Sequence, residues 1–269
     1  MIDTHAHLYS EEFDADRDDT VKRAVEKGVS HIIIPSTSKD DFDAMMKLCN
    51  DYAEICFPAV GLHPTSVKDG YVDELAFVEK QLDSNRFVAV GEIGIDCYWS
   101  TDYIVQQRDA FEKQVKLAER HNLPVIIHAR NSFDEIFSIL DRIHNSNVRG
   151  VFHGFSGTRE DYLKIREYGT FKTGIGGVIT FKNSKLPQVM DIIPVTDIVL
   201  ETDAPYLTPH PYRGQRNESS RIPIIAQKIA ELKNISVEEV DQITSENAKT
   251  LFHLSPLLPS QQGRRLDTM

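Results

Sequence analysis

Short apolar runs and longer amphipathic stretches alternate along the chain, with a repeat of about 25 to 35 residues. Several apolar runs are rich in β-branched residues and almost uninterrupted, which is typical of parallel strands buried on both faces. The pattern predicts eight strands, at residues 1–8, 30–37, 55–64, 87–96, 124–130, 150–157, 170–177 and 197–205.

The stretches between these runs have helical periodicity. The clearest covers 102–122, where Phe111, Val115 and Ala118 fall on one face. The segment 183–194 is short and contains Pro187, which disfavours a helix there. The other predicted helices cover about 11–28, 39–53, 71–83, 132–144, 158–168, 219–233 and 236–252, the last beginning at a capping-box sequence, SVEE.

Eight strands alternating with helices predict an α/β protein with a (β/α)8, TIM-like barrel. An open doubly wound sheet is the alternative, but no GxGxxG phosphate-binding sequence follows the first strand. Because no linker rich in Pro, Gly or Ser precedes residue 255, we expect a single barrel domain over 1–254. Residues 255–269 lack periodicity, which predicts an irregular C-terminal tail.

Polar residues gather at the carboxyl ends of the predicted strands, where barrel enzymes carry their chemistry. Five of the ten histidines fall there: His5, His7, His63, His128 and His153. The same strand ends also carry four carboxylates and one arginine: Glu92, Asp96, Glu201, Asp203 and Arg130. Because alternate residues of a strand share a face, His5 and His7 can converge on one ion with Asp3 behind them.

Each of these residues alone also has a structural explanation. A single HxH is usually just part of a strand, Glu92 could form a buried salt bridge, and His128 or His153 could be a core histidine. Since histidines and carboxylates together suit borderline or hard divalent ions, the joint pattern predicts a metal site. Glu92, with two oxygens, is the natural bridge if there are two ions, which could clamp a phosphodiester displacement.

Ordered motifs identify a resemblance that extends over about 5–252. They are DTHAHL (3–8), GLHP (61–64), GEIGID (91–96), IIHAR (126–130), HGFSG (153–157), ETDAPYL (201–207), RGQRNES (213–219) and NAKTLF (247–252). In this order and spacing the sequence resembles the TatD family of metal-dependent deoxyribonucleases, a branch of the amidohydrolase-like metallohydrolase barrels.

The resemblance implies a barrel with a centre of two divalent ions, Mg²⁺, Mn²⁺ or Zn²⁺. By motif, the metal ligands would be His5, His7, Glu92, His128, His153 and Asp203. Glu92 would bridge, and Asp203 could also accept a proton from the attacking water. His63 would lie near the scissile phosphate or behind a ligand, and Arg130, Arg213 and Arg216 would meet phosphate oxygens, which suits the planar guanidinium. Asp3 is expected to orient a histidine ring without touching the metal.

Charge and cysteine content restrict the partners. A net charge of −11 argues against coating duplex DNA through a basic face, although a polyanion could still bind a local site. The odd number and spacing of Cys49, Cys56 and Cys97 predict free thiols in a reducing compartment. With no apolar run of about 18 residues and no signal-peptide pattern, we expect a cytoplasmic protein without a membrane or obligate protein partner.

The leading functional hypothesis is an exonuclease-type deoxyribonuclease that acts on single-stranded or frayed DNA, with Asp203, Glu92, His63 and Arg130 as catalytic residues. Tyr98, Trp99, Phe155 and Tyr206 could stack on bases or could simply pack their loops. One alternative is an amidohydrolase-like enzyme that cleaves an ester or amide. Many such relatives bridge their metals with a carbamylated lysine on strand four, whereas 87–96 contains no lysine. The other alternative is a non-catalytic, metal-binding scaffold.

Overall fold

A computed structural model of the chain describes residues 1–145 and 147–254, so the expected tail at 255–269 lies outside the described residues. Parallel strands form one eight-stranded sheet in chain order. They are β1 (Ile2–Asp3), β2 (His31–Pro35), β3 (Cys56–Val60), β4 (Ala89–Asp96), β5 (Val125–Arg130), β6 (Gly150–Phe152), β7 (Phe171–Ile175) and β8 (Ile198–Leu200). Each lies inside one of the runs predicted as strands, so these predictions are confirmed.

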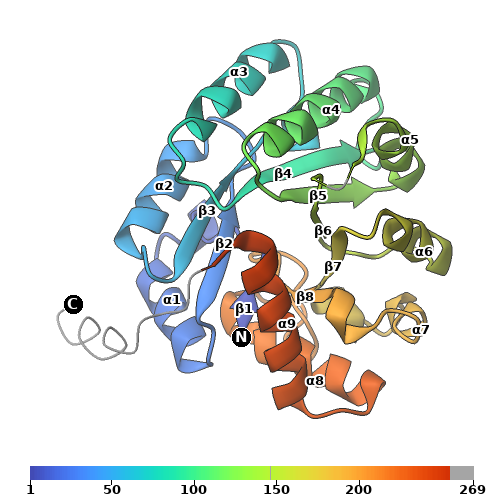
Figure 1. Cartoon of the computed structure of the whole chain (residues 1–269). Helices are drawn as coiled ribbons and strands as arrows, with labels where there is room; N and C mark the ends of the chain where they lie inside the picture. Colours follow the sequence, from blue (N-terminus) through green and yellow to red (C-terminus); the bar gives the residue numbers. More distant parts are fainter. Residues whose placement is uncertain (146, 255–269) are drawn as a thin grey trace.

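Helices lie outside the strands and follow the chain from blue to red (Figure 1). They are α1 (Arg17–Glu26), α2 (Phe42–Asp51), α3 (Tyr71–Leu82), α4 (Ile104–Arg120), α5 (Phe133–Ile143), α6 (Arg159–Tyr168), α7 (Leu186–Val189), α8 (Ile222–Lys233) and α9 (Val237–Phe252). Short 3₁₀ turns are η1 (Glu11–Phe13), η2 (Pro64–Ser66), η3 (Gly177–Thr180), η4 (Val195–Asp197) and η5 (Ser219–Arg221).

The helix predictions hold where the pattern is strong. Phe111, Val115 and Ala118 of α4 are buried, and the hydroxyl of Ser236 accepts a hydrogen bond from the backbone N–H of Glu239, completing the predicted capping box of α9. Segment 183–194 forms only the four-residue α7, which has Pro187 in its first turn, because proline can start a helix but not sit inside one.

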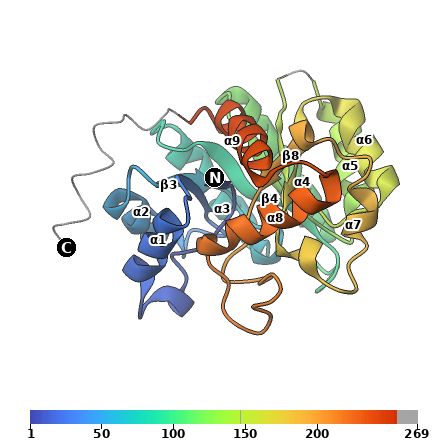
Figure 2. The ribbon, with the colours of Figure 1, turned by 90° about the horizontal axis from the view of Figure 1, so that it is seen from below.

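The two ends of the sheet meet. Thr4 donates from its backbone N–H to the carbonyl of Leu200 at 2.9 Å, and Ala6 and Ala204 form a parallel bridge. Figure 2 shows α1 (blue) and α8 (orange), from opposite ends of the chain, on the same side of the molecule. The structure is therefore the predicted (β/α)8 barrel and not an open sheet.

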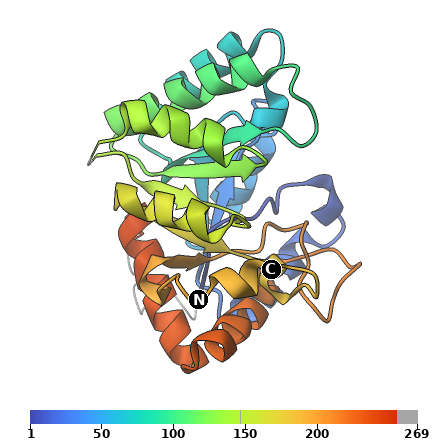
Figure 3. The same cartoon turned by 90° about the vertical axis from the view of Figure 1, so that its right-hand side faces the viewer.

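One end of the barrel is sealed by apolar packing. Seven strands contribute an inward cluster to this end: Ile2, Ile33, Ala59, Ala89, Ile126, Val151 and Val199. The last turns of α9 and the residues after it complete the cluster with Ala248, Leu251, Phe252 and Leu254. In Figure 3, α9 (red) lies at one end of the strands and the loop of 201–218 (orange) at the other. Polar chemistry is thereby confined to the loop end, where the strands terminate.

The part of the chain that the structure describes contains no helix long and apolar enough to cross a membrane.

Candidate metal centre

The six side chains expected to bind metal come together at the carboxyl ends of the strands. His5 and His7 follow β1, Glu92 and His128 lie within β4 and β5, His153 follows β6, and Asp203 follows β8. With those of His63, their donor atoms fall into three overlapping groups, each within 4.8 Å: His5–Glu92–His153, His5–His7–Asp203, and His63–Glu92–His128. His63, which was not among the expected ligands, thus lies within contact distance of two of them.

The chain after β1 brings His5 and His7 together without being a regular strand. β1 ends at Asp3, but the bridge at Ala6 and a hydrogen bond of 2.7 Å from the His7 N–H to the Ala204 carbonyl keep the segment against the β8 loop. The two Nε2 atoms lie 3.1 Å apart. Such a pair of ring nitrogens can only share a proton or a cation, which is the behaviour expected of paired metal ligands.

Glu92 is at the centre of the cluster, and its two oxygens divide the histidines between them. Oε2 lies 3.1 Å from the Nε2 of His5 and 3.5 Å from that of His7. Oε1 lies 2.6 Å from His153 Nε2, 2.9 Å from His128 Nδ1 and 3.2 Å from His63 Nε2. One carboxylate therefore contacts two sets of imidazoles, as a bridging ligand between two ions would.

The electrostatics of the cluster favour cations. Burial would raise the pKa of Glu92, but the imidazoles of His153, His63 and His5 lower it well below its ordinary value. Burial, with help from His153, lowers the pKa of His5 well below its ordinary value. Burial opposes it, but Glu92 together with Asp96 raises the pKa of His128, and Glu92 together with Glu201 raises the pKa of His153 well above its ordinary value. The buried carboxylates therefore attract positive charge to the ring nitrogens, which suits a divalent ion in the place of protons.

Asp203 closes the side of the cluster formed by the β8 loop. Its Oδ1 lies 3.7 Å from the Nε2 of both His5 and His7. The backbone has φ of 57°, a left-handed conformation that Asp adopts more readily than most residues, and its N–H donates to the His5 carbonyl. Burial raises the pKa of Asp203 to about 6.

Groups behind the histidines fix their rings, and no role for these groups could be predicted from the sequence. Asp96 Oδ2 lies 2.9 Å from His128 Nε2, and the Tyr9 hydroxyl lies 3.1 Å from His7 Nδ1. Asp96 and Tyr9 keep the opposite nitrogens of the His128 and His7 rings directed at the cluster. Glu201 accepts a hydrogen bond from the Gly154 N–H, and it lies 3.8 Å from His153 Nδ1, which has no hydrogen-bond partner among residues 1–145 and 147–254. Position at a strand end was the only signal for Asp96 and Glu201.

His63 is held differently from the other histidines. Its Nδ1 accepts the backbone N–H of Thr65 at 3.2 Å, which places the proton of the neutral ring on Nε2. Nε2 faces Glu92 Oε1 and so acts as a donor there. This arrangement suits a hydrogen bond to an anionic substrate better than direct metal ligation.

Asp3 does not orient a histidine ring, so that prediction is wrong. Its carboxylate accepts from the N–H and hydroxyl of Thr202, at 2.9 and 2.6 Å, and from the backbone N–H of His5 at 3.3 Å. The ring atom His5 Nδ1 has no hydrogen-bond partner among the described residues. Asp3 instead joins the β1 and β8 loops, because buried backbone N–H groups need an acceptor.

The donor set fits divalent metal. Ring nitrogens and carboxylate oxygens converge at 2.6–3.7 Å in a buried site, and the rings of His7 and His128 are oriented through their other nitrogen. Nitrogen and oxygen donors in this mixture are the ligands of Zn²⁺, Mn²⁺ and related ions.

The predicted arginines differ in their surroundings. Arg130 is exposed, with its Cζ 3.9 Å from the Tyr98 ring centre. Arg213 donates to the Thr208 carbonyl at 2.9 Å and lies over Phe181. Arg216 forms two hydrogen bonds with Asp16, at 2.7 and 2.8 Å, and lies over Phe13. Because these contacts occupy its guanidinium, Arg216 is less suited to binding phosphate than the exposed Arg130.

Asp16 joins Arg216 to Arg23, and this network should be sensitive to acid. Hydrogen bonds from Arg216, with those from Arg23, hold the pKa of Asp16 well below its ordinary value. A lowered carboxyl pKa contributes stability above about pH 4 that is lost as the pH falls further. We expect Asp16→Asn to lower the free energy of unfolding by about 1 kcal/mol at pH 7, a value discounted because the pair is partly exposed.

Urea unfolding at pH 7 and at pH 3 would measure this difference, which should shrink at the lower pH. Asp51→Asn is the matched control, since Asp51 forms a single exposed pair with Lys47 and should change stability by less than about 0.5 kcal/mol. A loss for Asp16→Asn that is the same at both pH values would contradict the role of charge.

Phe155 cannot stack on a base, so its aromatic ring serves loop packing, the other of its two expected roles. It is 2 % exposed and packs against Phe133 with ring centres 5.9 Å apart. By contrast, Tyr98, Trp99 and Tyr206 are each more than half exposed.

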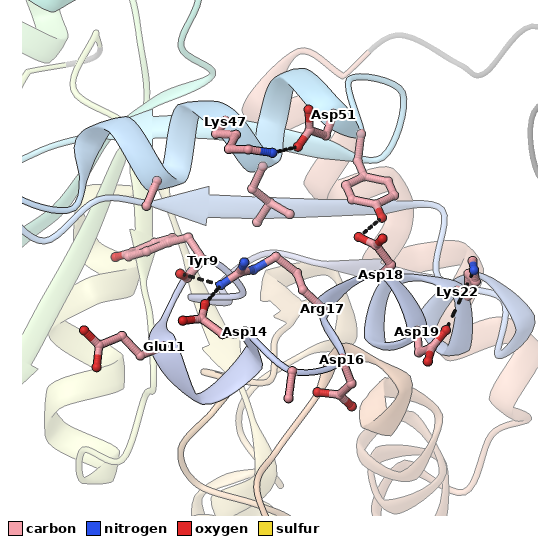
Figure 4. A pocket seen from close by; sticks show the side chains of 14 residues that line it. Tyr9, Glu11, Asp14, Asp16, Arg17, Asp18, Asp19, Lys22, Lys47 and Asp51 are labelled. Atoms are coloured by element: carbon pink, nitrogen blue, oxygen red, sulfur yellow. Dashed lines mark hydrogen bonds and ion pairs between the residues drawn. The ribbon is translucent and has the colours of Figure 1, made fainter. Parts of the chain in front are cut away.

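A separate hollow of about 560 Å³ lies between the start of α1 and α2, lined by several carboxylates. Figure 4 shows that many of these are already paired, Asp14 with Arg17, Asp19 with Lys22 and Asp51 with Lys47. The hollow shares only Tyr9 with the surroundings of the metal cluster. We therefore assign the chemistry to the strand ends and not to this hollow.

A parallel barrel with buried histidines and carboxylates at its strand ends defines the class of the protein, a metal-dependent barrel hydrolase. The chain belongs to the TatD-related DNase family. The model of that family, described as "TatD related DNase", matches residues 2–253. The resemblance seen in the motifs is thereby confirmed.

Relatives match along nearly the whole chain. An uncharacterized metal-dependent hydrolase of Bacillus subtilis, YabD, is 36 % identical over 95 % of this chain and 100 % of its own length. A protein of Erwinia tasmaniensis named 3'-5' ssDNA/RNA exonuclease TatD is 33 % identical, covering 94 % of this chain and all of its own. The crystal structure of the TatD homologue YjjV from Escherichia coli superimposes with a TM-score of 0.87 and 32 % identity, over 95 % of this chain and 98 % of that one.

Proposed function

We propose that this metal-dependent hydrolase is a deoxyribonuclease that removes nucleotides from the ends of single-stranded or frayed DNA. The observation that carries the proposal is the position of Glu92, whose two oxygens contact two sets of imidazoles. The relative named as a single-stranded DNA and RNA exonuclease supports nucleic acid as the substrate.

Two ions would share Glu92 as their bridge. His5, His7, His128, His153 and Asp203 would hold the ions together with Glu92. When bound, divalent ions supply positive charge that makes hydroxide available near neutral pH and offsets charge on phosphoryl oxygens.

The remaining residues act on water and phosphate. The Asp203 carboxylate, beside His5 and His7, would orient the attacking water and accept its proton. With Glu92 bound to metal, the Nε2 proton of His63 would be free to donate to a phosphate oxygen. The exposed Arg130 would bind a phosphate through its planar guanidinium. A barrel mouth admits a flexible single strand more readily than a duplex, which supports the preference for ends.

A cytoplasmic location is part of the proposal. It rests on the three cysteines, Cys49, Cys56 and Cys97, which are free thiols, as is usual in a reducing compartment.

Release of nucleotides from an end-labelled oligonucleotide tests the function. We expect Mg²⁺ or Mn²⁺ to support stepwise shortening of a single strand, EDTA to abolish it, and added metal to restore it. A blunt duplex of the same sequence should be shortened at least about tenfold more slowly, because its ends must first open. If the protein hydrolysed small esters or amides but left the oligonucleotides uncleaved, the proposal would be contradicted. Metal binding without any turnover would contradict it as well.

A further inference from the structure

Tyr98, Trp99 and Arg130 form an exposed cluster, here called the aromatic platform. Trp99 is 70 % exposed and Tyr98 53 %. Their rings meet edge to face with centres 5.0 Å apart, and the Arg130 guanidinium lies 3.9 Å from the Tyr98 ring centre and 5.2 Å from that of Trp99. An indole left so open to water is unusual, because burying a large aromatic ring contributes substantial free energy.

The platform is attached directly to the candidate metal centre. Asp96 Oδ1 accepts hydrogen bonds from the backbone N–H groups of Tyr98, at 2.9 Å, and Trp99, at 3.4 Å. The other oxygen of the same carboxylate contacts His128 Nε2 at 2.9 Å. One buried side chain thus holds both the ring of an expected ligand and the start of the aromatic loop.

The backbone that carries Arg130 is fixed on the neighbouring strand. Arg130 ends β5, two residues after His128, and its carbonyl accepts the N–H of Cys97 at 2.9 Å. Its own N–H donates to the Ser132 hydroxyl at 3.0 Å. The platform therefore presents the exposed rings of Tyr98 and Trp99 and a positive charge, on backbone held by β4 and β5 next to the expected ligand His128.

We propose that the aromatic platform binds a nucleobase of the single strand by stacking, and so holds the strand whose phosphate enters the metal centre. This inference rests on the proposed function and names how that site recognises its substrate. Every base has a π face, so stacking would make binding tolerant of sequence, while Arg130 offsets the phosphate beside the stacked base. The adjoining cation and metal centre favour a nucleic-acid strand over an apolar protein surface as the occupant.

Intrinsic fluorescence can test the stacking without any cleavage, because Trp99 is the only tryptophan of the chain. The full-length protein would be titrated in EDTA with a thymidylate oligomer and with an abasic deoxyribose-phosphate oligomer of equal length and charge. We expect the thymidylate oligomer to quench the fluorescence and the abasic oligomer to leave it nearly unchanged. Equal quenching by both oligomers, or none by either, would overturn the proposal.

Cleavage by variants supplies the second measurement. For Trp99→Ala we expect KM for a base-bearing oligomer to rise by about tenfold to hundredfold, in line with the usual effect of losing one stacked base, with kcat little changed. Trp99→Phe should recover most of the loss, and cleavage of the abasic oligomer should not respond to either change. Leu163→Ala is the matched control, since Leu163 is 48 % exposed on α6.

The two measurements separate the platform from the proposed function. Quenching by the thymidylate oligomer without hydrolysis under any metal would support the platform and contradict the nuclease. Metal-dependent hydrolysis that is unchanged in Trp99→Ala would overturn the platform and leave the nuclease standing.

Discussion

Glu92→Gln is expected to abolish the activity of this protein, lowering kcat/KM at least about a thousandfold. The amide keeps the size of the side chain but loses its charge, and it turns an N–H₂ group toward ring nitrogens that now contact an oxygen. Both sets of imidazoles lose their common partner. Metal content should therefore fall together with the rate.

Metal analysis of the purified protein and hydrolysis of an end-labelled single strand would be measured on the same preparation. Circular dichroism would show whether the barrel remains folded. Glu160→Gln is the control, because Glu160 is exposed on α6, and it should keep both metal and rate. A Glu92→Gln protein that retains metal and turns over normally would remove the central argument for a bridging carboxylate.

Gly94→Ala is expected to have the largest effect on stability, a loss of at least about 4 kcal/mol or failure to accumulate as folded protein. Gly94 lies in β4 between Glu92 and Asp96 with φ of 146°. A Cβ there would lie 2.0 Å from the carbonyl oxygen of His128 and 2.8 Å from its carbon. Because both atoms belong to the paired backbone of β5, the clash cannot be relieved by a rotamer change.

Gly28→Ala is the control that distinguishes the two contributions to the loss of stability in Gly94→Ala, the steric clash and the strain of a positive φ. Gly28 has φ of 82°, but a Cβ at this position would meet no atom within 4 Å, so we expect a loss of only about 1 kcal/mol. Thermal and urea unfolding of both variants would be compared. Similar small losses for the two would show that β4 and β5 can move apart, and that the close approach is not required.

The barrel could be predicted from the sequence because the periodicity of its apolar residues is strong. Uninterrupted β-branched runs became buried parallel strands, and the apolar face of α4 packs as its spacing predicted. The segment at 183–194 lacks such a pattern, and its extent was set by Pro187 and by packing. Most strands are shorter than the predicted apolar runs, because the hydrogen bonding of the sheet stops where the loops begin, as it does after Asp3.

Part of the site could be predicted and part could not. Histidines at strand ends had to converge once the barrel closed, so the cluster around Glu92 follows from topology. The topology of the barrel does not determine which loop residues contact one another. The pairing of Arg216 with Asp16, the burial of Phe155 and the bond from Tyr9 to His7 depend on how loops fold over the barrel, which local pattern does not encode.

The closure between Thr4 and Leu200 also sets when the centre can assemble. The expected ligands extend from residue 5 to residue 203, and His5 depends on the β8 loop through the hydrogen bond from the Asp203 N–H to its carbonyl. A chain emerging from the ribosome therefore holds only scattered ligands until its last strand has been synthesised. Metal uptake should be a late event in biogenesis, and fragments ending before β8 should retain ions poorly.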